Sequence, residues 1–140
     1  MAEFNVDRIR QIAGEVNSSL TKLERYAGLS EKDFLSNEEG IDSAKYNLII
    51  AIEGAIDICN HIVAKSGGRT PNDHSDCFAV LGELKLIEDE FVERLKRMAK
   101  FRNLLVHLYW RVDDSKVFRI INKDIADIKD FLKAVDKILS

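Results

Sequence analysis

The sequence has little proline and little glycine, which argues against a protein built from strands and tight turns. One proline and seven glycines occur in 140 residues, whereas an all-β fold needs many more turn-forming residues. Cysteine is also scarce. Cys59 and Cys77 alone cannot form a disulfide framework or a four-ligand zinc site. Both lie in apolar helical patterns, where a free thiol behaves as a small hydrophobic side chain, so we expect a reducing, cytoplasmic setting.

Long apolar runs are absent as well. The most apolar stretch, residues 48–64, is interrupted by Glu53, Asp57 and His61, so we expect no segment that crosses a bilayer. Residues 1–10 carry four charged side chains and no apolar core, which is unlike a secretory signal peptide. We therefore expect no contact with a membrane.

What the chain does contain is a balanced supply of core and surface residues. Hydrophobic residues make up 46% and charged residues 32%, which predicts one globular domain over residues 1–140. Apolar side chains recur at helical spacing almost throughout. The pattern predicts helices over about 6–27, 41–65, 73–87, 90–108 and 115–139, with a short helical turn after a Ser30 cap. The expected fold is all-α, a compact up-and-down bundle of four to five main helices.

The charges are unevenly distributed. The whole chain has a net charge of −3, which does not suggest a nucleic-acid-binding protein. Residues 94–111 nevertheless hold six basic residues and no acidic one, against fifteen basic and twenty-four acidic residues elsewhere. Such a cationic helix can attract phosphate, although a solvated face or a docking face for an acidic partner has the same composition. As RNA-binding candidates we take Lys96, Arg97, Lys100 and Arg111.

The same segment contains a candidate chemical centre, Arg102-Asn103-Leu104-Leu105-Val106-His107-Leu108-Tyr109. On one continuous helix, Asn103 and His107 share a face, and Arg102 nearly aligns with Tyr109. Arg102 and His107 are splayed by roughly 140°. They can share a site if the helix loosens near His107, or if a second subunit supplies the complementary group.

Arginine and histidine together suit cleavage of RNA by its own 2′-hydroxyl. A histidine can take the hydroxyl proton or protonate the leaving oxygen. A permanently charged guanidinium such as that of Arg102 stabilises negative charge on the phosphate, and Asn103 can orient the phosphate or the imidazole. The chemistry needs no metal or other cofactor. Spacing alone is also compatible with a partly buried His107 and a surface cation at Arg102.

A polar stripe on the predicted second long helix offers support for this centre. Glu53, Asp57 and His61 follow one another at intervals of four residues. A metal site is conceivable there, but the chain has no Glu-x-x-His pair of the di-iron type. We expect instead that Glu53 or Asp57 pairs with Arg102 or another cation and orients it. We expect no chemical role for His61 or His74.

The octapeptide resembles the R-N-x-x-x-H-x-Y signature of the HEPN superfamily, specifically its HepT-like toxin branch. Residues 42–45 and 51–62 are similar to that branch's second-helix pattern, and the resemblance covers roughly residues 5–138. It implies a dimeric helical bundle in which Arg102 and His107 of both subunits line one cleft. The implied activity is a metal-independent endoribonuclease that cuts transfer or messenger RNA and leaves a 2′,3′-cyclic phosphate.

The resemblance also implies a partner. Members of the branch have a cognate minimal nucleotidyltransferase as antitoxin, which can transfer AMP to the motif tyrosine, here Tyr109. Two alternatives stay open. The chain can be a non-catalytic HEPN module that binds a nucleotidyltransferase or a nucleotide, or a helical dimer without catalytic function.

Overall fold

The computed structural model describes residues 3–140; residues 1 and 2 of the expected domain lie outside the described part. Within it, the chain folds into helices joined by short connections, with no strand among the described residues. The elements are α1 Val6–Ala27, α2 Glu31–Leu35, α3 Glu38–Lys65, α4 His74–Glu83, α5 Asp89–His107, the 3-10 helix η1 Tyr109–Arg111, α6 Asp114–Lys123 and α7 Ile125–Leu139. The prediction of an all-α bundle is confirmed.

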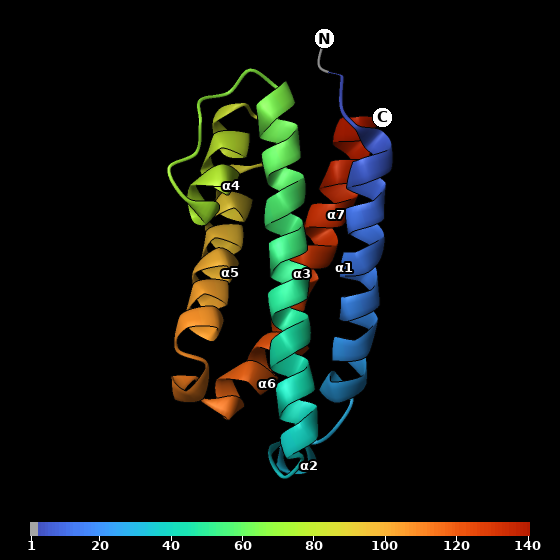
Figure 1. Cartoon of the computed structure of the whole chain (residues 1–140), viewed down its shortest axis with the longest axis vertical. Coiled ribbons are helices and arrows are strands. Elements are labelled where there is room, and N and C mark those ends of the chain that lie inside the picture. Colours follow the sequence, from blue (N-terminus) through green and yellow to red (C-terminus); the bar gives the residue numbers. More distant parts are fainter. Residues whose placement is uncertain (1–2) are drawn as a thin grey trace.

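The four longest helices form the up-and-down bundle (Figure 1). The chain descends along α1, returns along α3, descends along α5 and returns along α7, so both termini lie at one end. Helix α3 is the central element because it packs against each of the six other α-helices. This burial explains its composition. By length and composition it could span a membrane, contrary to our expectation, but 56% of its most apolar 18 residues are buried inside the bundle.

Side-chain caps fix the starts of five helices. Asn5, Ser30, Asn37, Asp73 and Asp113 each cap a helix by accepting a hydrogen bond from a backbone N–H in the first turn. Because Asn37 is a cap, α3 begins at Glu38 rather than at Ile41. The apolar faces then form one continuous core, in which the α1 residues Ile9, Ile12, Val16, Leu20 and Leu23 are almost completely buried.

Two further helix boundaries differ from the prediction. Helix α4 ends at Glu83 instead of Ile87, because Lys85 adopts a left-handed φ of 60° and the N–H of Leu86 bonds to the carbonyl of Leu81, closing the helix as a Schellman motif. The expected last helix is two helices, which separate at Asp124. Its apolar spacing continues across Asp124, so periodicity does not reveal the break. Helix α6 packs on α2, whereas α7 packs on α5.

The two cysteines meet in the core. Cys59 on α3 and Cys77 on α4 are both fully buried, and their Sγ atoms lie 2.7 Å apart as free thiols. Burial is the main cause that raises the pKa of the Cys59 thiol, and the hydrogen bond with Cys77 adds to it. The Cys59 thiol therefore stays protonated, and the two buried side chains act as apolar packing between α3 and α4.

Candidate functional site

The candidate site lies where α5 ends, at the opposite end of the bundle from the chain termini (Figure 1). Arg102, Asn103 and His107 belong to the last turns of α5, and His107 is its final residue. Leu108 leaves the helical region with φ −131° and ψ 41°. Tyr109 begins the 3-10 turn η1, so the alignment with Arg102 that one continuous helix would give is not present. The helix stays regular from Arg102 to His107 and ends only afterwards, so its end does not bring these two side chains together.

Arg102 is held in place by its neighbours. Its Nε and Nη2 donate hydrogen bonds of 3.1 Å and 2.5 Å to Oε1 of Glu53 on α3. Its Nη1 donates to Oδ1 of Asn103 at 2.9 Å. The Arg102 side chain is 15% exposed and that of Glu53 is 42% exposed, so the pair lies at the edge of the bundle. The expected pairing of Arg102 with a carboxylate of the α3 stripe is present, and Glu53 supplies it.

Asp57, the other expected partner, does not contact Arg102. Its Oδ1 lies 3.6 Å from Nε2 of His61, one helical turn further along α3. Neither residue reaches the end of α5 by a hydrogen bond or an ion pair in the described structure. No three His, Cys, Asp or Glu side chains gather as a possible metal site within residues 3–140. His74 is the first residue of α4.

His107 contrasts with Arg102. Its side chain is exposed and, among the described residues, makes no hydrogen bond and no ion pair. The ideal helix separates it from Arg102 by roughly 140° around the axis. One chain therefore presents a fixed guanidinium on the α3 side of the helix and an unrestrained imidazole on its outer face.

Tyr109 is positioned by two residues of α3. Its hydroxyl donates a 2.9 Å hydrogen bond to Oδ1 of Asp42, while Nζ of Lys45 lies 4.5 Å from the ring centroid. Lys45 is buried, and its Nζ also donates to the carbonyl of Tyr109 at 3.4 Å and pairs with Asp114 at 3.1 Å. Burial, followed by the bond to Asp42, raises the pKa of the Tyr109 hydroxyl to about 12. The hydroxyl is therefore neutral at physiological pH, with a carboxylate ready to accept its proton.

The family assignment follows from comparison with known proteins. The family model described as "HepT-like: Ribonuclease HepT-like" matches residues 16–135, most of the chain. The chain belongs to the ribonuclease HepT-like family.

Named relatives agree with this assignment. The HepT-like chain is 38% identical over 94 residues to a "Putative RNase" of Archaeoglobus fulgidus, covering 67% of this chain and 70% of that protein. It is 30% identical over 94 residues to the "mRNA nuclease HepT" of Shewanella oneidensis, covering 67% and 71%.

Solved structures share the fold. A toxin–antitoxin crystal structure with AMP-PNP matches with a TM-score of 0.87 at 24% identity, covering 94% of this chain and 98% of that chain. A tri-AMPylated Shewanella oneidensis HEPN toxin in complex with its MNT antitoxin matches with a TM-score of 0.85 at 24% identity, covering 92% and 96%.

The predicted RNA-binding cations of this HepT-like chain do not share one surface. Arg97 and Lys100 line a groove between α5 and α6. Lys96 instead lies 3.7 Å from Glu93, and its charge lowers the pKa of Asp76 on α4, so it faces the other side of α5. Arg111 is exposed on η1.

Arg69, in the loop after α3, is held by acidic side chains of α4. Its guanidinium donates two hydrogen bonds to Asp76, of 2.6 Å and 2.8 Å, and three to Glu83. It therefore ties the loop after α3 to both ends of α4.

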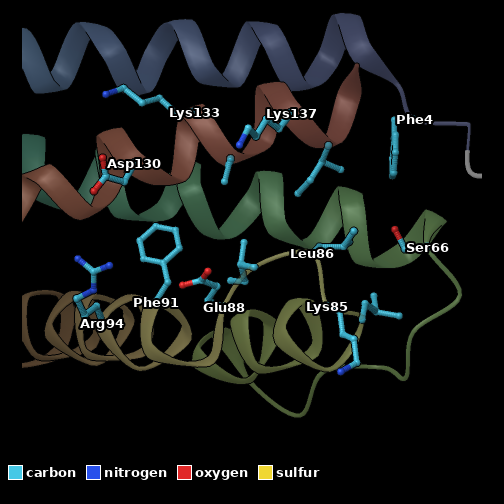
Figure 2. A pocket seen from close by; sticks show the side chains of 14 residues that line it. Phe4, Ser66, Lys85, Leu86, Glu88, Phe91, Arg94, Asp130, Lys133 and Lys137 are labelled. Atoms are coloured by element: carbon cyan, nitrogen blue, oxygen red, sulfur yellow. The ribbon is translucent and has the colours of Figure 1, made fainter.

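A cavity of about 980 Å³ lies far from the motif, near the chain termini (Figure 2). Phe91 of α5, Leu86 of the α4–α5 connection and Lys133 and Lys137 of α7 surround it. None of the expected site residues lines it. Cavity size therefore does not identify the family motif.

Sequence reasoning missed two residues of the site, Asp42 and Lys45. Both lie in the segment on which the family resemblance rests, but the sequence assigned them no role. Their spacing of three residues placed them on one helix face. What the sequence could not supply was the turn after α5, which brings Tyr109 back against that face.

Proposed function

We propose that this protein is a metal-independent endoribonuclease toxin that cuts transfer or messenger RNA through attack by the 2′-hydroxyl. The observation that carries the proposal is the Arg102 guanidinium, fixed by Glu53 and Asn103 on the same helix that ends with a free His107. Membership in a ribonuclease family supports the same reaction class.

In this mechanism His107 acts as general base and takes the proton of the 2′-hydroxyl. The O2′–P bond forms and the P–O5′ bond breaks, which leaves a 2′,3′-cyclic phosphate. The departing O5′ receives a proton from a second, protonated His107. Arg102 has five N–H donors, and Glu53 and Asn103 occupy three. Two donors therefore remain for the non-bridging oxygens, where charge develops.

A homodimer would supply the second histidine. Tyr46 on α3 is 62% exposed and Val106 on α5 is 41% exposed. Tyr46 is seven residues from Glu53 and Val106 is four from Arg102, so apolar side chains border the Arg102–Glu53 pair on both helices. We propose that a second copy covers this apolar border and joins the two motifs in one cleft.

Replacing Val106 by a buried charge tests the dimer. Val106→Glu should shift the mass measured by light scattering from dimer to monomer and abolish cleavage with it, because an unpaired carboxylate is costly inside an interface. Leu29→Glu is the matched control, since Leu29 is 37% exposed and lies between α1 and α2. A Val106→Glu protein that remains dimeric and active contradicts this interface.

We propose that the partner is a minimal nucleotidyltransferase antitoxin that transfers AMP to Tyr109. The tyrosine oxygen would attack the α-phosphate of ATP, pyrophosphate would leave, and Asp42 would accept the hydroxyl proton. The 2.9 Å bond from Tyr109 to Asp42 supports this path for the proton. The transferred phosphodiester adds negative charge at the end of α5 and would repel RNA.

RNA cleavage in excess EDTA tests the catalytic proposal. Wild-type protein should yield cyclic-phosphate ends, while His107→Ala and Arg102→Ala should yield none. Arg10→Gln, an exposed change on α1, should cut like wild type. If unmodified wild type leaves every RNA intact, or if the His107 variant cuts equally well, catalysis is refuted and a non-catalytic module that binds a nucleotidyltransferase becomes the better interpretation.

A further inference from the structure

A groove of about 920 Å³ runs between α5 and the α6–α7 segment, beside the candidate site. Its floor is apolar, formed by Met98, Phe101, Leu104 and Ile120. Its walls carry cations from two separate helices: Arg97 and Lys100 from α5, and Lys116, Arg119 and Lys123 from α6. The sequence did not connect these two sets, because they are separated by the turn at η1.

These five cations outnumber the carboxylates of the groove, which are Asp124, Asp127 and Asp130 on its α7 side. All five are exposed, and none takes part in an ion pair within the described residues. Arg94, which also lines the groove, is paired with Asp127 at 2.9 Å. On a chain whose net charge is −3, this surface has the opposite sign. Unpaired cations at such density attract a polyanion.

The groove is continuous with the outer face of α5 at His107. Lys100 and His107 are seven residues apart and differ by only about 20° around the ideal helix. Arg97 and Leu104 are likewise seven apart and lie next to them on the same side. The α5 wall of the groove therefore continues along the helix to the imidazole of His107. Around the helix axis, His107 lies between Lys100 and Arg102.

We propose that this groove binds the sugar–phosphate backbone of single-stranded RNA and guides it to His107. This inference rests on the proposed ribonuclease function, because it assigns the path of that enzyme's substrate. Cations on two facing walls above an apolar floor fit a narrow chain with charge along its length, which describes an RNA strand better than a folded acidic protein. A symmetric pairing of two such grooves does not fit, because it would bring like charges together.

The test is the binding of a short, fluorescent 2′-O-methyl oligonucleotide, measured by anisotropy over a range of salt concentrations. This probe lacks the attacking hydroxyl, so binding is measured without cleavage. The groove variant is Lys100→Gln/Arg119→Gln, with one change on each wall. Its matched control is Arg10→Gln/Lys22→Gln, which removes two exposed, unpaired charges from α1, outside the groove.

Counterion release sets the expected size of the effect. Each phosphate contact to single-stranded nucleic acid contributes about 0.7 to the salt slope, or roughly fivefold in affinity at about 0.1 M salt. The groove variant should therefore bind about 25-fold more weakly and lose about 1.4 from the slope. The control should bind like wild type. Thermal melting checks that both double variants remain folded.

Three results would overturn the proposal: no binding by wild type, equal binding by the groove variant, or an equal loss in the control. If the groove variant binds RNA normally but loses its nucleotidyltransferase partner, the groove is a protein-docking surface instead. A failure of the proposed catalysis looks different. In that case the oligonucleotide still binds through the groove, while unmodified RNA stays intact in the cleavage assay.

Discussion

Removing the Glu53 carboxylate is the sharpest test of how the site is built. Oε1 of Glu53 accepts both hydrogen bonds that Arg102 sends to α3. Glutamine can keep an acceptor oxygen at the same place but carries no charge, whereas alanine removes the acceptor. Glu53→Gln and Glu53→Ala therefore separate the effect of charge from the effect of position.

The exposure of the Arg102–Glu53 pair determines how much free energy its hydrogen bonds contribute. Hydrogen bonds to charged groups contribute about 1.5–3 kcal/mol when protected, while exposed ion pairs contribute about 0.2–1 kcal/mol. The Arg102 side chain is 15% exposed and that of Glu53 is 42% exposed. We therefore expect Glu53→Ala to lose about 1.5 kcal/mol of interaction free energy with Arg102. Glu53→Gln should lose about half of this free energy, because a neutral acceptor forms a hydrogen bond roughly half as strong as a charged one.

Cleavage rates report whether this contact positions the guanidinium. If it does, kcat/KM should fall about tenfold in Glu53→Ala and about threefold in Glu53→Gln, since about 1.4 kcal/mol corresponds to a factor of ten. The graded loss of kcat/KM is informative when both variants are folded at the assay temperature, because unfolding then does not contribute to it. Thermal melting should show both variants folded at the assay temperature.

Asp57→Asn is the comparison within the same stripe of α3. Asp57 contacts His61 and not Arg102, so its loss removes a carboxylate from the helix without releasing the guanidinium. We expect kcat/KM to change by less than about twofold in Asp57→Asn. An equal fall in Asp57→Asn would show that general charge on α3 matters rather than the contact. A rise in activity in Glu53→Ala would show that Glu53 restrains Arg102 instead of orienting it.

Three further predictions concern the scaffold. A Cβ on Gly54 would lie 2.3 Å from Cγ2 of Val16, so Gly54→Ala should lower the unfolding free energy by about 1–3 kcal/mol in urea titrations. A Cβ on Gly14 would have no neighbouring atom within 4 Å, so Gly14→Ala should instead raise the unfolding free energy by about 0.5–1 kcal/mol. Destabilisation by both substitutions would contradict the close approach of α1 and α3. Hydrogen bonds from Arg69, and then from the N–H of Asn72, lower the pKa of Asp76 from 3.8 to about 2. The Asp76 carboxylate therefore stabilises the folded state fully above pH 3.8, and this stabilisation is lost as the pH falls to about 2. Arg69→Gln should flatten the dependence of the melting temperature on pH in that window, and an unchanged curve would refute the assignment. Cys59 and Cys77 should react with a disulfide reagent only as fast as the protein opens, since both are fully buried; immediate labelling of the native protein would refute their burial.

The sequence predicts the helices well where the signal is local. The start of α1 at Val6 and its end at Ala27 follow from the apolar spacing and the following glycine. The α6–α7 break at Asp124 could not be predicted in this way. The isoleucines continue at helical spacing through it, and the break depends on which neighbours each helix packs against.

The candidate site likewise has features that the sequence predicts and features that depend on how the helices pack. The motif placed Arg102, Asn103 and His107 on one helix, and the polar stripe of α3 predicted a carboxylate partner. Which carboxylate it is depends on the height at which α3 crosses α5, a property of packing that spacing does not encode. The Asp42–Tyr109 bond and the α6 wall of the groove depend on the turn at η1, which reverses the chain after the helix.

The different restraint on Arg102 and His107 has a chemical reason under the proposed mechanism. A guanidinium stays charged throughout the reaction, so it works best when fixed where charge develops on phosphate, and Glu53 and Asn103 supply that fixation. An imidazole has to exchange its proton with substrate, so a permanent partner within the chain would compete with the reacting oxygens. A His107 without such a partner, at the helix end that the cationic groove approaches, leaves its nitrogens to the RNA. The asymmetry thus fits one residue that stabilises charge and one that transfers protons.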